Sequence, residues 1–271
     1  MAKNTNGGRY KYAEKIKPYR DMIRSQLAME EKVLQAIKKD SDGAGLKRLT
    51  LAEEMIYVTA NYLILSGISQ SMLRLRNEES LNDGRKALYK AVIYLEEIVS
   101  PFLDVPFSDY EERLAEIGSV DANKKYSLIR KMGLALQLLE NAYGDNTKWK
   151  WAFVELEGRF AAVAKNMMNL KTAIVNTDPG SPDYEPTMYH LRMLKKLLMQ
   201  AADRYREKYE LSTNRVDDFK MGINFLNSLR RIHSLLGERE SAETLKKKAD
   251  IWSAKLEKDT KKQEETTLKR I

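Results

Sequence analysis

The sequence of 271 residues contains no cysteine and only two histidines. The absence of cysteine excludes disulfides, zinc–thiolate sites, iron–sulfur clusters and cysteine nucleophiles. Two histidines cannot supply the ligand sets of most zinc or copper sites. The Glu-x-x-His motif of di-iron bundles is also missing, because Thr187 precedes His190 and Arg230 precedes His233 at that spacing. We therefore expect no metal ion and no cofactor, and we expect both histidines to be hydrogen-bonded residues without a chemical role.

The sequence also lacks the glycine-rich phosphate loops and the Gly-x-Ser-x-Gly elbow of common enzyme classes. Adjacent acids such as Glu30–Glu31 and Glu53–Glu54 are the remaining candidates for acid–base chemistry. Neighbouring residues on a helix point about 100° apart, so these carboxylates do not converge on one point. We expect the protein not to be an enzyme, and an unrecognised carboxylate site remains the alternative.

No long apolar run has the character of a membrane span. Residues 55–73 carry no charge, but Thr59, Asn61, Ser66 and Gln70 lie among them, which favours a helix buried inside the protein. The first 25 residues have no apolar segment of the kind found in secretory signals. These features and the lack of cysteine lead us to expect a cytoplasmic protein.

The pattern of apolar residues is helical. From Trp149 to Ile174 they recur in alternating steps of four and three, which places them on one stripe of a helix. Since no segment alternates as a strand does, we predict an all-α fold: an irregular antiparallel helical bundle or array of about nine helices, with no β-sheet. The expected helices span residues 18–39, 48–77, 81–100, 108–117, 121–143, 147–177, 186–211, 214–236 and 238–262.

Prolines and capping signals mark the expected helix ends. Pro18 is taken as the start of the first helix, because proline breaks helix interiors. Thr50 and Ser108, each followed three residues later by Glu, form candidate capping boxes. Three glycines that follow apolar stripes are candidate left-handed caps. They are Gly118, Gly144 and Gly237.

Positive charge is concentrated at the two ends of the chain. Residues 1–24 hold seven Lys and Arg against two acids, and residues 246–271 hold nine against five. The chain as a whole has a net charge of +8. We predict a basic, tyrosine-rich arm at 1–20, a main bundle at 21–177, a three-helix unit at 187–262 and a polar tail at 263–271.

The arm is the most suggestive segment for binding. Its cations could neutralise phosphates while its aromatic rings stack on the bases of a single-stranded nucleic acid. It could equally lie on a neighbouring subunit, or its tyrosines could pack on the protein's own bundle. The candidate residues are Arg9, Tyr10, Lys11, Tyr12, Lys15, Lys17, Tyr19 and Arg20.

The last helix carries a second cationic group, Lys246, Lys247 and Lys248. A solvated helix face is the simplest interpretation, and binding of nucleic acid or of an anionic membrane surface is the alternative. Trp149 begins the longest apolar stripe and is expected in the core. Trp151 and Trp252 are candidate interface residues.

Together these features favour a non-enzymatic helical scaffold or assembly subunit. It would contact a protein partner, or further copies of itself, through its helix faces and basic ends. The alternative is a nucleic-acid-binding protein of a nucleoprotein or packaging type, which would bind single strands through the same ends. A peripheral membrane adaptor is a weaker hypothesis, and binding to a membrane surface is not expected.

Overall fold

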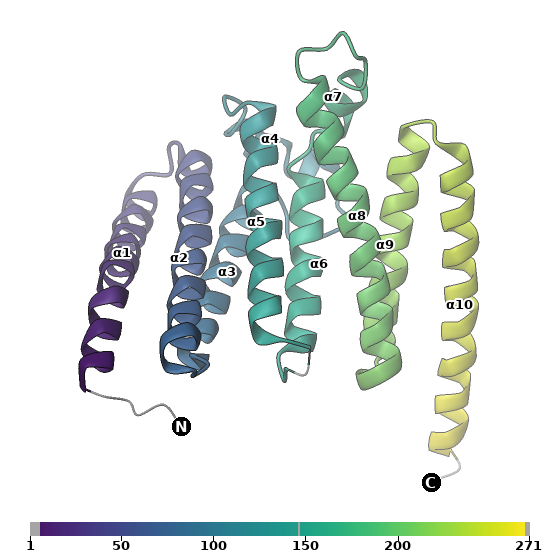
Figure 1. The fold of residues 1–271 in the computed structure, drawn as a ribbon. Helices are drawn as coiled ribbons and strands as arrows, with labels where there is room; N and C mark the ends of the chain where they lie inside the picture. The colour runs from purple at the N-terminus through teal and green to yellow at the C-terminus, as the bar shows by residue number, and fades with distance from the viewer. Residues whose placement is uncertain (1–5, 146, 269–271) are drawn as a thin grey trace. The chain divides into compact units, whose positions relative to one another are not determined.

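In the computed structural model, the backbone is described for residues 6–145 and 147–268, and side chains for residues 8–145 and 147–262. These residues form ten α-helices and no β-strand, which confirms the predicted all-α class (Figure 1). No helix in the described part of the chain combines the length and the apolar character needed to cross a membrane. The helices are α1 (Asn6–Lys39), α2 (Ala44–Leu73), α3 (Glu78–Ile98), α4 (Glu111–Ala115), α5 (Ala122–Tyr143), α6 (Lys150–Asn166), α7 (Leu170–Val175), α8 (Tyr184–Lys208), α9 (Val216–Leu235) and α10 (Arg239–Leu268).

Contacts between Cα atoms divide the chain into two compact units. Unit 1 comprises residues 1–100 and 107–150, and unit 2 comprises residues 101–106 and 151–271. This division differs from the predicted one, which placed the seam in the loop at 178–186. That loop connects two helices of unit 2.

Unit 1 is organised around α2. This helix packs against α1, α3 and α5, so all but a narrow stripe of its surface is covered. Figure 1 shows α1, α2 and α5 side by side, with α3 behind them. The uncharged run at 55–73 lies within α2, and Met55, Val58 and Leu65 from this run are buried. The interpretation of that run as a buried helix is therefore confirmed.

In unit 2, α9 packs between α8 and α10. A π-helical turn, η2 (Tyr209–Thr213), follows α8 and brings Tyr209 over Phe219 of α9, with ring centres 4.7 Å apart. Trp252 of α10 lies on the same Phe219 ring at 5.7 Å. This aromatic stack joins the three helices in the core of the unit.

The predicted helices at 18–39 and 147–177 differ most from the structure, and the one at 48–77 is displaced by four residues at each end. The first helix begins at Asn6 and contains Pro18, so the predicted arm is helical from residue 6 onward. The predicted helix at 147–177 is two helices, because Asn169 caps a new helix by accepting from the amides of Lys171 and Thr172. An Asn in that role marks the start of a new helix, so the predicted single helix is divided here.

The two capping boxes are wrong, whereas two of the three glycine caps are right. Thr50 lies inside α2 and donates to the carbonyl of Leu46, and Ser108 lies in the 3₁₀ turn η1 (Phe107–Asp109) before α4. Gly144 and Gly237 both have φ of 73°, the left-handed conformation that ends a helix. Gly118 is not among the glycines with positive φ.

Candidate docking face on the first helical unit

α1 turns one stripe of its surface toward the rest of unit 1. Tyr12, Ile16, Tyr19 and Ile23 recur at steps of four and three, and all are buried or half-buried. This stripe packs on α2. Two of the three tyrosines in the predicted binding segment therefore pack on the protein itself, which was one of the three interpretations.

A buried carboxylate anchors the same stripe to α3. Glu30 is only 4% exposed, and it accepts hydrogen bonds from the Tyr94 hydroxyl and from Lys90 Nζ, the latter at 2.7 Å. Burial, and then the hydrogen bond to Glu30, raise the pKa of Tyr94 well above its ordinary value. A phenol that stays neutral keeps donating to the carboxylate, so the contact holds α1 in a fixed rotation about its axis.

A second, fully exposed stripe runs along α1 about 100° around the helix from the buried one. Its residues also follow steps of four and three, but none of them is an acid. Glutamates and aspartates of α1 lie elsewhere on the helix surface. The exposed stripe consists of Lys11, Lys15, Pro18, Met22, Ser25, Met29, Lys32 and Ala36.

α2 leaves one narrow, uncharged stripe uncovered, on which Tyr57, Ala60, Ile64 and Gly67 are exposed. Its edge toward α1 is fixed by Gln26, which donates to Glu54 at 3.1 Å and accepts from Asn61. Met22 and Met29 flank Gln26 on the solvent side of α1, one helical turn before and after it. These methionines therefore border the exposed stripe of α2.

The other edge of the α2 stripe meets α5. Lys131 of α5 donates to Glu53 at 2.6 Å and to the Tyr57 hydroxyl at 3.2 Å, and its ammonium lies 5.4 Å from the centre of the Tyr57 ring. Leu134 and Leu138 follow Lys131 on the same exposed side of α5. The ion pair thus places two leucines of α5 beside the tyrosine of α2.

Six exposed apolar side chains thus lie along the edges where α1 and α5 pack on α2, and we refer to them as the docking strip. Their exposed fractions range from 40% to 55%. α1 runs antiparallel to α2, and α5 runs parallel to it (Figure 1). With the register set by the hydrogen bonds of Gln26 and Lys131, we group the six side chains into two rows of three. One row is Met29, Tyr57 and Leu134, and the other is Met22, Ile64 and Leu138.

The cations of the predicted N-terminal site are all exposed on α1. Lys11 and Lys15 extend the α1 edge of the docking strip beyond Met22. The other three, Arg9, Lys17 and Arg20, lie on other sides of the helix, and Tyr10 is 71% exposed. The structure therefore spreads the predicted cations around the helix rather than gathering them into one patch.

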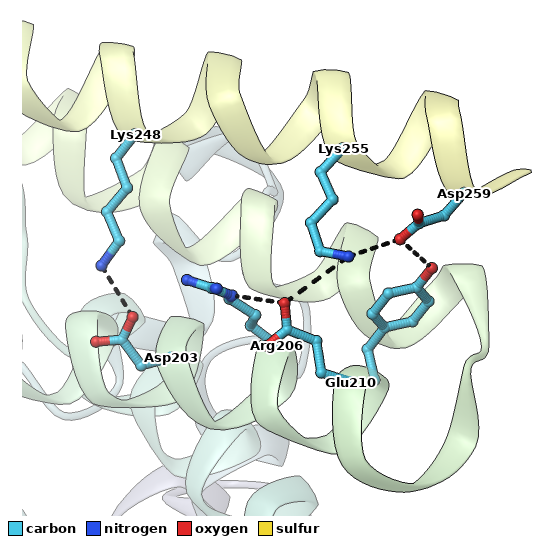
Figure 2. A network of polar contacts seen from close by, with 7 residues as sticks. Asp203, Arg206, Glu210, Lys248, Lys255 and Asp259 are labelled. Atoms are coloured by element: carbon cyan, nitrogen blue, oxygen red, sulfur yellow. Dashed lines mark hydrogen bonds and ion pairs between the residues drawn. The ribbon is translucent and has the colours of Figure 1, made fainter.

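The predicted C-terminal site in unit 2 is partly occupied by internal contacts. Lys248 pairs with Asp203 at 2.9 Å, and Lys255 lies between Glu210 and Asp259, so α10 is tied to α8 and its π-helical turn (Figure 2). Lys246 and Lys247 are exposed. Only these two of the three predicted lysines point to solvent.

Trp149 and Trp252 differ from their predicted roles, whereas the interface role of Trp151 stays a prediction. Trp252 is buried against Phe219, with Arg206 and Lys248 over its ring, so it belongs to the core of unit 2 and not to an interface. Trp151 is half-buried at the start of α6. Trp149, which was expected in the core, precedes α6 and is half-buried, with the Arg85 guanidinium 3.9 Å from its ring centre. Its apolar stripe continues from Phe153 without it, because the helix begins only at Lys150.

The groups with perturbed pKa values hold the fold together. His190 is buried and bonds to the Ala164 carbonyl at 2.9 Å, and burial lowers its pKa to about 4. Burial also lowers the pKa of Lys165 to about 8, while its amine donates to the carbonyl of Leu103 at 2.8 Å. His233 pairs with Glu238. The described residues contain no group of three or more acids and histidines placed to hold a metal ion.

A cleft of about 610 Å³ lies in unit 1 beside the half-buried Trp149. Its lining combines the cations Arg76 and Lys148 with the acids Glu78 and Glu79, so it favours neither sign of charge. Arg76 already pairs with Glu78 at 2.7 Å. The cleft therefore offers no chemistry that identifies a ligand.

Sequence reasoning missed every residue of the docking strip. Each of its members is an apolar residue of a helix and would be assigned to the core from the sequence. Helical spacing alone does not reveal which apolar residues remain exposed to solvent. The ridge of α1 without acidic residues was available as a signal, because Lys11, Lys15, Met22 and Met29 share one stripe.

Comparison with known proteins identifies one family. The model of the TP0443 family matches residues 8–260, so the chain belongs to that family. Neither the curated proteins nor the solved structures gave a match.

Proposed function

We propose that this member of the TP0443 family is a non-enzymatic scaffold that holds a protein partner on the docking strip of unit 1. The observation that carries the proposal is the strip itself. Six large apolar side chains are exposed on three helices that pack together, and the Lys131–Glu53 ion pair lies among them. Exposed apolar patches that span several elements are typical of interaction sites, since leaving them in water is unfavourable.

The strip is also held in place before any partner arrives. Glu30 fixes α1 to α3, Gln26 bridges α1 and α2, and Lys131 joins α5 to α2. A preorganised surface loses little conformational entropy on binding, so more of the contact free energy appears as affinity. This arrangement supports a rigid platform more than a surface that reorganises around its partner.

Site-specific photo-crosslinking in the source cells tests the proposal. A photoreactive phenylalanine analogue replaces Ile64 or Leu134 in the full-length protein, and Ile93 serves as the matched control. Ile93 is 38% exposed and lies on α3, away from the strip. We expect the same protein adduct from both strip positions and not from Ile93.

The crosslinked peptide of the partner is then identified by mass spectrometry, and the variant Leu134→Asp should abolish the adduct formed from Ile64. Equal adducts from all three positions, or none from the two strip positions, would contradict the proposal. Light scattering of the purified protein shows whether the partner is a second copy.

A second candidate function is binding of single-stranded nucleic acid by α1. The observation that favours it is the exposure of all five predicted cations of this helix together with Tyr10. If all five contact phosphates, log K should fall with log salt with a slope of about −3.5. A labelled oligonucleotide that fails to bind at low salt, or binds with the same slope after Lys15 and Lys17 are neutralised, would contradict it.

A further inference from the structure

We infer that the occupant of the docking strip is an amphipathic helix of a partner protein, with acidic residues on the flank that meets α1. This inference rests on the proposed function and specifies the chemistry of the partner. It is drawn from the spacing of the strip, from the absence of a sheet edge and from the distribution of charge around the strip.

The spacing of the strip matches that of a helix. Met22 and Met29 are seven residues apart, as are Tyr57 and Ile64, so each pair spans about 10.5 Å along its helix. A partner helix presents apolar side chains at i, i+3, i+4 and i+7 over the same length. The two rows of the strip can therefore receive apolar side chains of such a helix that are seven residues, or about two turns, apart.

An extended peptide has no comparable place to bind. Peptides that bind as strands add to the open edge of a sheet, where their backbone amides and carbonyls find partners. The described residues form no strand, and the strip offers side chains and not free backbone groups. A helix satisfies its own backbone, so it can lie on an apolar surface without leaving amides unpaired.

The methionines of α1 suit this mode of binding. Met22 and Met29 are flexible, unbranched side chains that adapt to the shape of an incoming apolar stripe. Tyr57 and the leucines of α5 provide the more rigid part of the surface. The strip thus has an adaptable edge on α1 and a fixed edge on α5.

Most of the exposed positive charge near the docking strip lies along its α1 edge. Lys11, Lys15 and Lys32 share the exposed ridge of α1 with the methionines, and none of them forms an ion pair with another described residue. On the opposite edge, Lys131 is already paired with Glu53. Acids on one flank of the bound helix would complement the three lysines of the ridge, whereas the α5 edge offers the exposed Arg130, one turn before Leu134.

A second copy of this chain is a poorer match. In a symmetric dimer the same surface appears on both sides of the contact. The two acids at the rim of the strip, Glu53 and Glu54, are already bonded to Lys131 and Gln26. Near the ridge itself, the exposed Glu14 lies one turn from Lys11, so two strips in contact would bring fewer free carboxylates than cations to this edge.

The test uses three fluorescent helical peptides of about 18 residues, long enough for about five turns. They share one leucine stripe and carry Glu, Gln or Lys along one flank. Binding to the full-length protein is measured by fluorescence anisotropy at low ionic strength. We expect the Glu peptide to bind about tenfold more tightly than the Gln peptide, and the Lys peptide to bind most weakly.

A pair of matched variants locates the effect. Replacing Lys11, Lys15 and Lys32 with Gln should remove the preference for the Glu peptide and leave the affinity for the Gln peptide unchanged. Replacing three other exposed lysines of α1 should preserve the preference, because they lie off the ridge. These control positions are Lys17, Lys38 and Lys39.

The outcomes separate this inference from the proposed function. If the Glu and Gln peptides bind equally well, and both lose affinity in Leu134→Asp, the docking function is supported and the inference about charge is overturned. Failure of all three peptides, while the crosslinks from Ile64 and Leu134 persist, would show that the partner is not a helix of this kind. An oligo(dT) that displaces the Glu peptide and loses affinity in the ridge variant would overturn the inference in favour of nucleic acid.

Discussion

Removal of the Glu30 carboxylate should release α1 from unit 1. In Glu30→Ala, the Tyr94 hydroxyl loses a buried, charged acceptor, and a hydrogen bond of that kind contributes about 1.5–3 kcal/mol. Lys90 is 47% exposed and regains water, so its part of the loss is only a few tenths of a kcal/mol. The expected destabilisation of α1 is therefore about 3 kcal/mol.

Hydrogen exchange of the α1 amides, read by mass spectrometry, measures this loss directly. A decrease of about 3 kcal/mol in the free energy of opening corresponds to exchange that is roughly 100-fold faster. The matched control is Glu31→Ala, since Glu31 is the exposed neighbour of Glu30 and should change stability by less than about 0.5 kcal/mol. Indistinguishable exchange of α1 in the two variants would refute the anchoring role.

The pH dependence of the same contact has a definite sign. The folded-state pKa of Tyr94 is raised, first by burial and then by Glu30, so the folded protein favours the neutral phenol. Its contribution to stability is complete below the unfolded pKa of about 10 and is lost as pH rises further. In Glu30→Ala the alkaline loss should be smaller, because only the effect of burial remains.

Two further predictions concern unit 2. The pKa of His190 is lowered to about 4, so the folded state binds fewer protons than the unfolded state between about pH 6.5 and 4. The free energy of unfolding, measured by urea titration, should therefore fall by up to about 3 kcal/mol as the pH is lowered through that window. In His190→Gln this pH dependence should be much weaker. An equally steep fall in the variant would exclude His190 as its cause. In Gly158→Ala, the new methyl would lie 2.6 Å from the Tyr205 ring, so we expect the free energy of unfolding to fall by about 1–3 kcal/mol. The control Gly67→Ala has open space around the new methyl and should be neutral or stabilising. A similar thermal midpoint for both glycine variants would show that the Tyr205 ring moves aside freely.

The position of Pro18 shows how tertiary packing overrides a local signal. Proline inside a helix costs about 3 kcal/mol, so the sequence predicts a helix that starts there. The structure continues the helix on both sides of Pro18, because Tyr12 and Ile16 before it and Tyr19 and Ile23 after it all pack on the same side of α1. Burial of this stripe offsets the lost backbone hydrogen bond.

The incorrect prediction of a capping box at Thr50 also has its cause in tertiary contacts. α2 begins at Ala44 because Gly43 adopts a left-handed φ of 63° and the amide of Gly45 donates to Glu116 at 2.8 Å. Glu116 comes from the turn after α4, far away in sequence. A cap supplied by a distant residue leaves no local motif, whereas Thr50-x-x-Glu53 has the local motif without the helix end.

The sequence by itself determined that this chain is helical and which stripe of α5, α8 and α10 faces inward. That information is local, since side chains three and four residues apart share a helix face whatever lies against it. It also determined that Met22 and Lys15 lie on one ridge. Only the tertiary structure decided that this ridge lies beside Tyr57 of α2, with Leu134 of α5 on the other side of that tyrosine, because the arrangement depends on how three helices are rotated and aligned against each other. It likewise decided that Lys248 is engaged with Asp203, a partner that no spacing along the sequence reveals.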